Sequence, residues 1–217
     1  MGLNAIFFNT PIEKNFVGHI MAEVYKDRVY APFLEGKKDL TIIDIGANIG
    51  ITSYYFSQFA KQIYALEPSI EHFDVMTTML KYNKITNVMP INKALYLKEG
   101  SFDFGGPDNN ATMRSLHSAT WQDGKPKETV QATTLPVLFK DFKIDHVDFC
   151  KLDVEGSETE IISSTSFKEV ADKIDCMVIE RHQWSGRNEN QIVDALKMVG
   201  FNVTQIPNQA DLIVAQR

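Results

Sequence analysis

The chain has 217 residues, of which 44% are hydrophobic and 23% are charged, a balance typical of a soluble globular protein with one full core. Its net charge of −6 disfavours a nucleic-acid partner, because phosphate backbones are bound by clustered Lys and Arg. The sequence has no apolar run of about 18 residues and no signal-peptide pattern, so we expect a cytoplasmic protein without a membrane span. Cys150 and Cys176 lie in apolar runs and are expected to be buried, reduced thiols.

Strand and helix patterns alternate along the chain. The β-branched run 40–45 (LTIIDI) predicts a strand buried on both faces, and residues 62–68 predict a second one. Ser69 is expected to cap the next helix. The predicted buried stripe of that helix consists of Ile70, Phe73, Met76 and Leu80. Residues 87–96 predict a third strand, although Pro90 is unusual in the centre of a sheet.

The C-terminal half continues the alternation. Residues 146–154 and 173–182 predict two further strands with a helix between them, and residues 191–199 predict a last helix. The two apolar runs after it, 201–206 and 211–217, are close enough in sequence to form an antiparallel pair. Successive strand–helix units predict a doubly wound α/β sheet in three αβα layers, mostly parallel with one reversed strand near the C-terminus.

Two segments fall outside this alternation. Residues 1–39 are expected to form a helical lead-in to a single domain that spans residues 40–217. Residues 97–129 are polar and rich in Gly, Asn and Asp, which is long for a passive connection inside a compact domain. We expect a short hairpin and a flap over the active site there, with Arg114 and His117 as candidates for substrate contact. The alternative is a disordered excursion.

The segment DIGANIG has the place of a nucleotide-binding turn, between the first strand and the first helix. Gly46 would let the backbone approach a ligand closely, Asn48 tolerates positive φ, and Gly50 permits close packing where the helix begins. Asp44 would repel a pyrophosphate but suits a ligand that carries an ammonium and a sulfonium, which favours S-adenosylmethionine over NAD. Glu67 ends the second strand, where a carboxylate can accept both ribose hydroxyls.

Four segments resemble motifs of a known family: 22–30 (AEVYKDRVY), 44–56 (DIGANIGITSYYF), 65–76 (ALEPSIEHFDVM) and 147–162 (VDFCKLDVEGSETEII). On these motifs the chain resembles the FkbM-type S-adenosylmethionine-dependent methyltransferases over most of its length. The resemblance implies a seven-stranded, Rossmann-like class I methyltransferase sheet. It also implies O-methylation of a hydroxyl on a sugar, polysaccharide or secondary metabolite. The family usually has Thr-Leu-Asp before the fourth strand, where this chain has Thr134-Leu135-Pro136.

The turn, the acidic end of the second strand and the resemblance together define a candidate site for S-adenosylmethionine. It consists of Glu23, Asp44, Gly46, Ala47, Asn48, Gly50, Glu67, Pro68, Ser69, Ala94 and Asp153. His19 and His72 are expected to be surface or packing residues. Two other classes of function stay open, a non-catalytic cofactor-binding module and an NAD-dependent oxidoreductase. The second is disfavoured because the Gly-x-Gly-x-x-Gly spacing is missing.

The candidate catalytic residues are Asp153, Glu180 and His182, at the ends of two strands expected to be neighbours. Asp153 is expected to face the methyl group, and Glu180 could orient His182 as a base or substrate ligand. Alternatively, Asp153 and Glu155 could only cap the next helix or anchor Lys151, and Glu158 could serve the helix dipole. The three catalytic candidates could also form a two-carboxylate, one-histidine metal site, but we expect no resident metal. The expected partner is a small-molecule or glycan acceptor, and the sequence does not indicate an oligomeric state.

Overall fold

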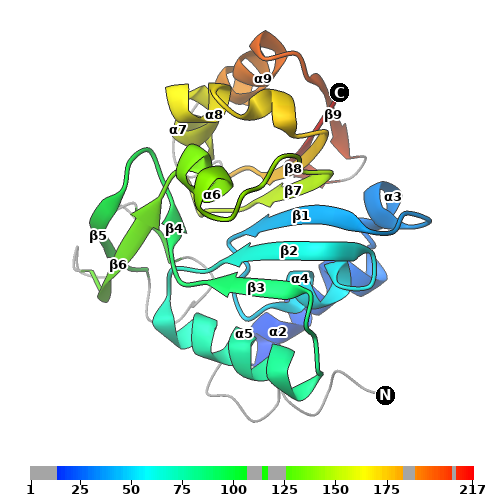
Figure 1. Ribbon diagram of the computed structural model, residues 1–217, viewed down its shortest axis with the longest axis vertical. Coiled ribbons are helices and arrows are strands. Elements are labelled where there is room, and N and C mark those ends of the chain that lie inside the picture. Colours follow the sequence, from blue (N-terminus) through cyan, green and yellow to red (C-terminus); the bar gives the residue numbers. More distant parts are fainter. Residues whose placement is uncertain (1–13, 107–113, 117–125, 183–188, 207–208) are drawn as a thin grey trace.

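The computed structural model describes residues 14–106, 114–116, 126–182, 189–206 and 209–217. Its centre is a seven-stranded sheet with the order β3-β2-β1-β7-β8-β10-β9 (Figure 1). The strands of this sheet are β1 (Leu40–Ile45), β2 (Ala60–Leu66), β3 (Val88–Ile91), β7 (Phe149–Leu152), β8 (Cys176–Glu180), β9 (Asn202–Ile206) and β10 (Gln209–Gln216). The predicted doubly wound sheet is therefore confirmed.

Strand direction also agrees with the prediction. The pairs β1–β2, β1–β7, β2–β3 and β7–β8 are parallel, whereas β10 runs antiparallel to both β8 and β9. β10 is thus the reversed strand near the C-terminus. Pro90 is accommodated because β3 is an edge strand, where a missing backbone N–H leaves no neighbour unpaired.

Helices cover both faces of the sheet and complete three layers. In Figure 1, α2, α4 and α5 lie on one side of the strands, and α6, α7, α8 and α9 lie on the other. The helical elements are α2 (Lys14–Met21), the π-helical turn η1 (Ala22–Lys26), α3 (Ala31–Leu34), α4 (Ile51–Phe56), α5 (Ile70–Tyr82), α6 (Leu135–Asp141), α7 (Glu158–Ser163), α8 (Thr165–Lys168), the 3-10 turn η5 (Ala171–Lys173) and α9 (Glu189–Met198). None of the described helices is long and apolar enough to cross a membrane.

The apolar core is divided by the sheet into two clusters. Successive residues of β1 alternate between them: Ile42 packs with the cluster that includes α4 and α5, and Ile43 packs with the one that includes α6, α7 and α9. This alternation explains why β1 reads as an unbroken β-branched run, since a strand covered on both faces has no solvent side. The predicted buried stripe of α5 is partly wrong, because Ile70 is 52% exposed. Met76 is fully buried as predicted, and so is Met79, which the prediction did not include.

The segment before β1 is anchored to the sheet by aromatic packing. Tyr30, which is 1% exposed, makes edge-to-face contacts with Phe56 and Phe149 at centroid distances of 5.2 and 6.3 Å. Phe33 stacks on Phe149 at 6.2 Å. Such pairs add to the area that aromatic rings bury and fix the orientation of the rings. The N-terminal elements are therefore packed against the same face of the sheet as α4.

A second, three-stranded sheet lies beyond the carboxyl ends of the main parallel strands (Figure 1). It consists of β4 (Ala94–Leu95), β5 (Gly100–Phe104) and β6 (Glu128–Thr133), in the order β4-β6-β5. The prediction of one strand over 87–96 is wrong, because the chain leaves the main sheet after β3 and enters the small sheet at β4. The expected hairpin around SFDF corresponds to β5, whose partner β6 the sequence did not indicate. The flap role of residues 97–129 stays a prediction, since 107–113 and 117–125, including His117, lie outside the described residues.

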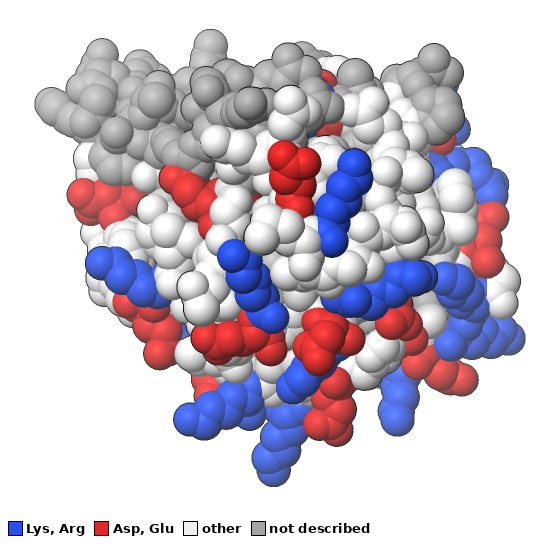
Figure 2. All heavy atoms as spheres, turned by 90° about the horizontal axis from the view of Figure 1, so that it is seen from above, with Lys and Arg blue, Asp and Glu red and all other residues white. Residues whose placement is uncertain are grey.

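The surface is mixed in charge on the face shown in Figure 2. Lys and Arg side chains are interspersed there with Asp and Glu. This face therefore lacks the single-sign field with which proteins attract a nucleic-acid backbone.

Candidate functional site

A cavity of about 650 Å³ lies at the carboxyl ends of the parallel strands, between the main sheet, the N-terminal elements and the small sheet. This volume lies within the range of roughly 300–1,000 Å³ that small-molecule sites occupy. The predicted site residues that line it are Glu23, Gly46, Ala47, Asn48, Glu67, Pro68, Ala94, Asp153 and Glu180. The other predicted site residues, Asp44, Gly50, Ser69 and His182, are not among the residues that line it. His19 and His72 also line the cavity, and His72 is only 2% exposed.

The turn after β1 is shaped by three residues with positive φ. Asn48 has φ 52°, as its residue type suggested, and Gly46 and Gly50 have φ 73° and 87°. A Cβ on Gly50 would stand 2.7 Å from Met76 Cγ, which confirms the close packing expected there. A Cβ on Gly46 would stand 1.8 Å from the carbonyl oxygen of Asp153. The close approach at Gly46 is therefore to the neighbouring strand end, where the sequence had suggested a ligand.

Glu67 is held rigidly at the end of β2. Its Oε2 accepts a hydrogen bond from the Asn48 backbone N–H at 2.8 Å, and its Oε1 accepts one from the Ser69 N–H at 2.9 Å. The side chain is 4% exposed and still lines the cavity. Each carboxylate oxygen has a second lone pair, so both oxygens can still accept hydrogen bonds from hydroxyl groups of a ligand. Glu67 thus connects the β1 turn to the β2 end and presents a pre-oriented acceptor.

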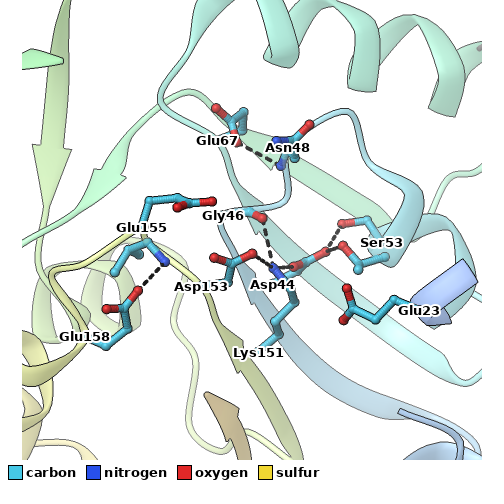
Figure 3. Close-up of polar contacts among 12 residues, drawn as sticks. Glu23, Asp44, Gly46, Asn48, Ser53, Glu67, Lys151, Asp153, Glu155 and Glu158 are labelled. Atoms are coloured by element: carbon cyan, nitrogen blue, oxygen red, sulfur yellow. Dashed lines mark hydrogen bonds and ion pairs between the residues drawn. The ribbon is translucent and has the colours of Figure 1, made fainter. Parts of the chain in front are cut away.

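Asp44 lies below the cavity in a buried polar cluster (Figure 3). Its Oδ2 accepts hydrogen bonds from Thr52 Oγ1 at 2.7 Å and Ser53 Oγ at 2.6 Å, and the residue is fully buried. Burial raises the pKa of Asp44, while Lys151 and the two hydroxyls lower it. Asp44 is not among the residues that line the cavity, and its direct contact with a ligand stays a prediction.

Lys151 joins the two motifs at the centre of the site. Its ammonium donates to the Gly46 carbonyl and to Asp153 Oδ2, each at 3.0 Å, and lies 3.9 Å from Asp44 Oδ1 (Figure 3). Burial lowers the pKa of Lys151, but the carboxylates of Asp153 and Asp44 outweigh burial, so the pKa is raised and the ammonium stays charged. A lysine inside the apolar strand FCKL was a sequence signal for such a role, because a buried Lys requires acidic partners.

Ser69 precedes α5, but its side chain makes no capping hydrogen bond, contrary to the expectation. Its Oγ instead accepts from Arg114 Nη1 at 2.7 Å, and Arg114 Nη2 forms an ion pair with Glu71 at 2.6 Å. Arg114 lines the cavity, so the segment between β5 and β6 does reach the predicted cofactor side.

Glu23 comes from η1 and faces the cavity from the side opposite to Glu67. Its Oε1 accepts a hydrogen bond at 2.9 Å from the buried hydroxyl of Tyr30. Burial raises the pKa of Glu23, whereas the Tyr30 hydrogen bond and Lys151 lower it. The packing of Tyr30 against the sheet therefore fixes where this carboxylate points.

The loop after β7 wraps around the carboxylate of Glu158. Glu158 Oε1 accepts from the backbone N–H groups of Val154 and Gly156, at 3.2 and 3.0 Å, and the residue is 2% exposed. Glu158 Oε1 also lies 2.9 Å from His182 Nδ1. Glu155, at φ 53°, places its Oε2 3.1 Å from His182 Nε2. Glu158 thus does more than interact with a helix dipole, and nothing in the sequence connects it to a histidine 24 residues away.

His182 is held between carboxylates on both ring nitrogens. Burial lowers the pKa of His182, but the hydrogen bonds that its ring donates to Glu155 and Glu158 outweigh burial and raise it to about 11. With both nitrogens engaged, neither is free to accept a proton, so the geometry favours a positioning role over the base suggested by the sequence. Glu158 orients the imidazole through Nδ1, and the expected orientation of His182 by Glu180 stays a prediction.

Carboxylates outnumber cations around this end of the cavity. The Asp153 carboxylate and burial raise the pKa of Glu180 to about 8, and burial raises the pKa of Glu155 to about 7. Lys151 and His182 are the cations that contact these groups among the described residues. A ligand or ion with positive charge is therefore electrostatically favoured here.

Comparisons with known proteins identify the family and the fold. The curated relative Methyltransferase sdnD of Sordaria araneosa is 25% identical over 233 residues, covering 91% of this chain and 89% of its own length. The structure of Methyltransferase FkbM from Methylobacillus flagellatus superposes with a TM-score of 0.57 at 13% identity, over 94% of this chain and 52% of that one. The structure of SMU.1697c from Streptococcus mutans, solved in complex with SAH, superposes with a TM-score of 0.52 at 12% identity. The match covers 89% of this chain and 96% of that one. These structures share the fold. The model of the methyltransferase FkbM domain matches residues 44–203, so the chain belongs to the FkbM methyltransferase family.

Proposed function

We propose that this methyltransferase uses S-adenosylmethionine and methylates a hydroxyl group of a sugar, polysaccharide or secondary metabolite. The observation that carries the proposal is that one cavity joins the Asn48–Glu67 cradle to the carboxylates of Asp153 and Glu180. The cradle presents a fixed carboxylate suited to two ribose hydroxyls, and the acidic end suits a cationic cofactor. The bound cofactor would supply an electrophilic methyl group on a sulfonium.

The chain's own residues would act mainly by positioning. Glu67 and the turn hold one end of the cavity, while Lys151 fixes Asp153 relative to Gly46 at 3.0 Å contacts. Orientation of an acceptor oxygen opposite the methyl group can lower the barrier by roughly 7–11 kcal/mol. Asp153 and Glu180 are the groups that would orient the acceptor hydroxyl. The structure of SMU.1697c with SAH supports a cofactor of this type in the shared fold.

The first test is ligand choice. S-adenosylhomocysteine and NAD are compared for thermal stabilisation and by calorimetry, with Glu169→Gln, an exposed site remote from the cavity, as the matched control for Glu67→Gln. Stabilisation by S-adenosylhomocysteine that is weakened only in the Glu67 variant supports the cradle. Stabilisation by NAD alone would overturn the proposal.

The second test is the acceptor. Polyhydroxylated acceptors and their amine-bearing analogues are incubated with S-adenosylmethionine, and methylated products are identified by mass spectrometry. We expect methylated hydroxyls, with turnover reduced about a hundredfold or more in Asp153→Asn. Methylation of amines only would refute the finer proposal and leave the methyltransferase assignment intact.

A further inference from the structure

Asp153, Glu155 and His182 bring three donor atoms of metal-ligand type together at the wall of the cavity. One carboxylate oxygen of Asp153, one of Glu155 and one imidazole nitrogen of His182 all lie within 4.8 Å of one another. Asp153 and Glu155 line the cavity directly, so an ion bound between them would be open to a ligand. The sequence alone favoured no metal and would have placed Glu180, instead of Glu155, in such a group.

The separations of these atoms match those around one ion. Metal–donor bonds of about 2.1 Å in octahedral geometry place cis donors about 3.0 Å apart and trans donors about 4.2 Å apart. His182 Nε2 lies 3.1 Å from Glu155 Oε2 and 4.0 Å from Asp153 Oδ1. Small rotations of the side chains would therefore bring three donors around one cation.

The surroundings of the cluster are those of a supported metal site. The imidazole of a metal ligand usually has a hydrogen bond from its other nitrogen to a carboxylate, which fixes the ring. Glu158 supplies this contact to Nδ1 at 2.9 Å and is itself fixed by the backbone of Gly156. Asp153 Oδ1 is buried and has no hydrogen-bond partner in the described part of the chain.

The backbone supports the same conclusion. Glu155 has φ 53°, a conformation that is uncommon for a residue without a side-chain amide and that is often found at functional sites. The Glu155 carboxylate lies against His182, with Oε2 3.1 Å from Nε2, and Glu155 lines the cavity. Strain at this point is explained if the position of the carboxylate matters for a ligand.

We propose that Asp153, Glu155 and His182 bind one divalent cation of the Mn²⁺ or Mg²⁺ class, which also takes the acceptor hydroxyl as a ligand. Two carboxylates and one imidazole suit such an ion, and the remaining positions are open to water or substrate. On binding, the cation replaces the proton between His182 Nε2 and Glu155. The ion would polarise the hydroxyl and favour release of its proton to water, a role that the imidazole of His182 does not provide. The hydroxyl oxygen would then form a bond to the methyl carbon as the carbon–sulfur bond breaks, and the cofactor would leave as the neutral thioether. The acceptor part of this inference rests on the proposed function.

Direct binding tests the site without any methyl transfer. Mn²⁺ is titrated into the chelator-treated full chain without cofactor, and free Mn²⁺ is followed by electron paramagnetic resonance. We expect one site per chain, weakened at least a hundredfold in His182→Gln and Glu155→Gln. Glu158→Gln, which alters the hydrogen bond to His182 Nδ1 and the backbone contacts of the loop but removes no proposed ligand, should weaken it about 10- to 100-fold.

His146 provides the matched control, because it forms a similar cluster with Asp148 and Asp175 on the exposed surface, away from the cavity. Mn²⁺ binding should be unchanged in His146→Gln. Binding of S-adenosylhomocysteine by each variant shows that it is folded, and Glu155→Gln serves if His182→Gln does not fold. Absence of a site in the parent chain, or its loss only with His146→Gln, would overturn the proposal.

A chelator arm separates this inference from the proposed function. We expect methyl transfer to stop in excess EDTA and to return with added Mn²⁺ or Mg²⁺. Full transfer in EDTA would refute the cation and keep the methyltransferase function. Mn²⁺ binding in a chain that methylates no hydroxyl would support the site and refute the acceptor class.

Discussion

The contact between Gly46 and the Asp153 carbonyl gives a quantitative prediction for Gly46→Ala. The new Cβ would start 1.8 Å from that oxygen and would need at least 3.0 Å, so the ends of β1 and β7 would have to separate by about 1.2 Å. The backbone at φ 73° costs a residue with a Cβ about 1–2 kcal/mol. Overpacking of this kind typically costs a further 1–3 kcal/mol. We therefore expect a loss of about 2–5 kcal/mol of unfolding free energy.

Gly36→Ala is the matched control, because Gly36 has φ 81° and open space where the Cβ would be. It carries the same backbone penalty and the same effect on the unfolded chain, without the clash. Urea unfolding should place Gly46→Ala about 1–3 kcal/mol below Gly36→Ala. In thermal unfolding the difference should be about 2–12 °C for a chain of this size. Equal losses in the two variants would refute the close approach as the reason for glycine at position 46.

Three further predictions concern the same cluster and the core. Glu67→Gln should weaken S-adenosylhomocysteine binding at least about tenfold, since it removes a charged acceptor, whereas Glu169→Gln should bind normally in calorimetry. Lys151→Met should lower the unfolding free energy by about 3–5 kcal/mol, because it leaves buried carboxylates without their cation. Adding Asp44→Asn should recover part of this loss, since it removes one uncompensated charge. If urea unfolding shows no recovery in the double variant, the ion-pair argument is contradicted. Burial raises the pKa of both cysteine thiols, so a thiol reagent near neutral pH should modify them only after denaturation, and rapid modification of the native chain would show that they are accessible.

The strands of the main sheet were predictable because the sequence signals that identify them are local. Apolar β-branched runs identify strands buried on two faces, and the residues that end them, such as Asp44 and Glu67, fall at one edge when the strands are parallel. The positive φ of Asn48 followed from its residue type and its place in the turn.

The features that the sequence did not reveal depend on contacts between distant segments. β6 became a strand because β4 and β5 pair with it, and its mostly polar sequence, ETVQAT, lacks the apolar run that identified β1. The contact of Glu158 with His182 joins a helix to the end of another strand. The Gly46 approach depends on the distance between two strand ends, which residue types do not report.

The central position of Lys151 explains why two motifs about a hundred residues apart act as one unit. Its ammonium binds the carbonyl of Gly46, in the turn proposed to hold the cofactor, and the carboxylate of Asp153, at the proposed acceptor end. The missing Cβ of Gly46 lets the two backbones approach, and the ammonium makes the complete burial of Asp44 tolerable. A displacement of the turn is therefore transmitted to Asp153 through short, charge-assisted contacts, and with it to the proposed cation. Since a misplacement of about 1 Å can cost a hundredfold in rate, this coupling is the physical reason to expect cofactor placement and acceptor activation to change together.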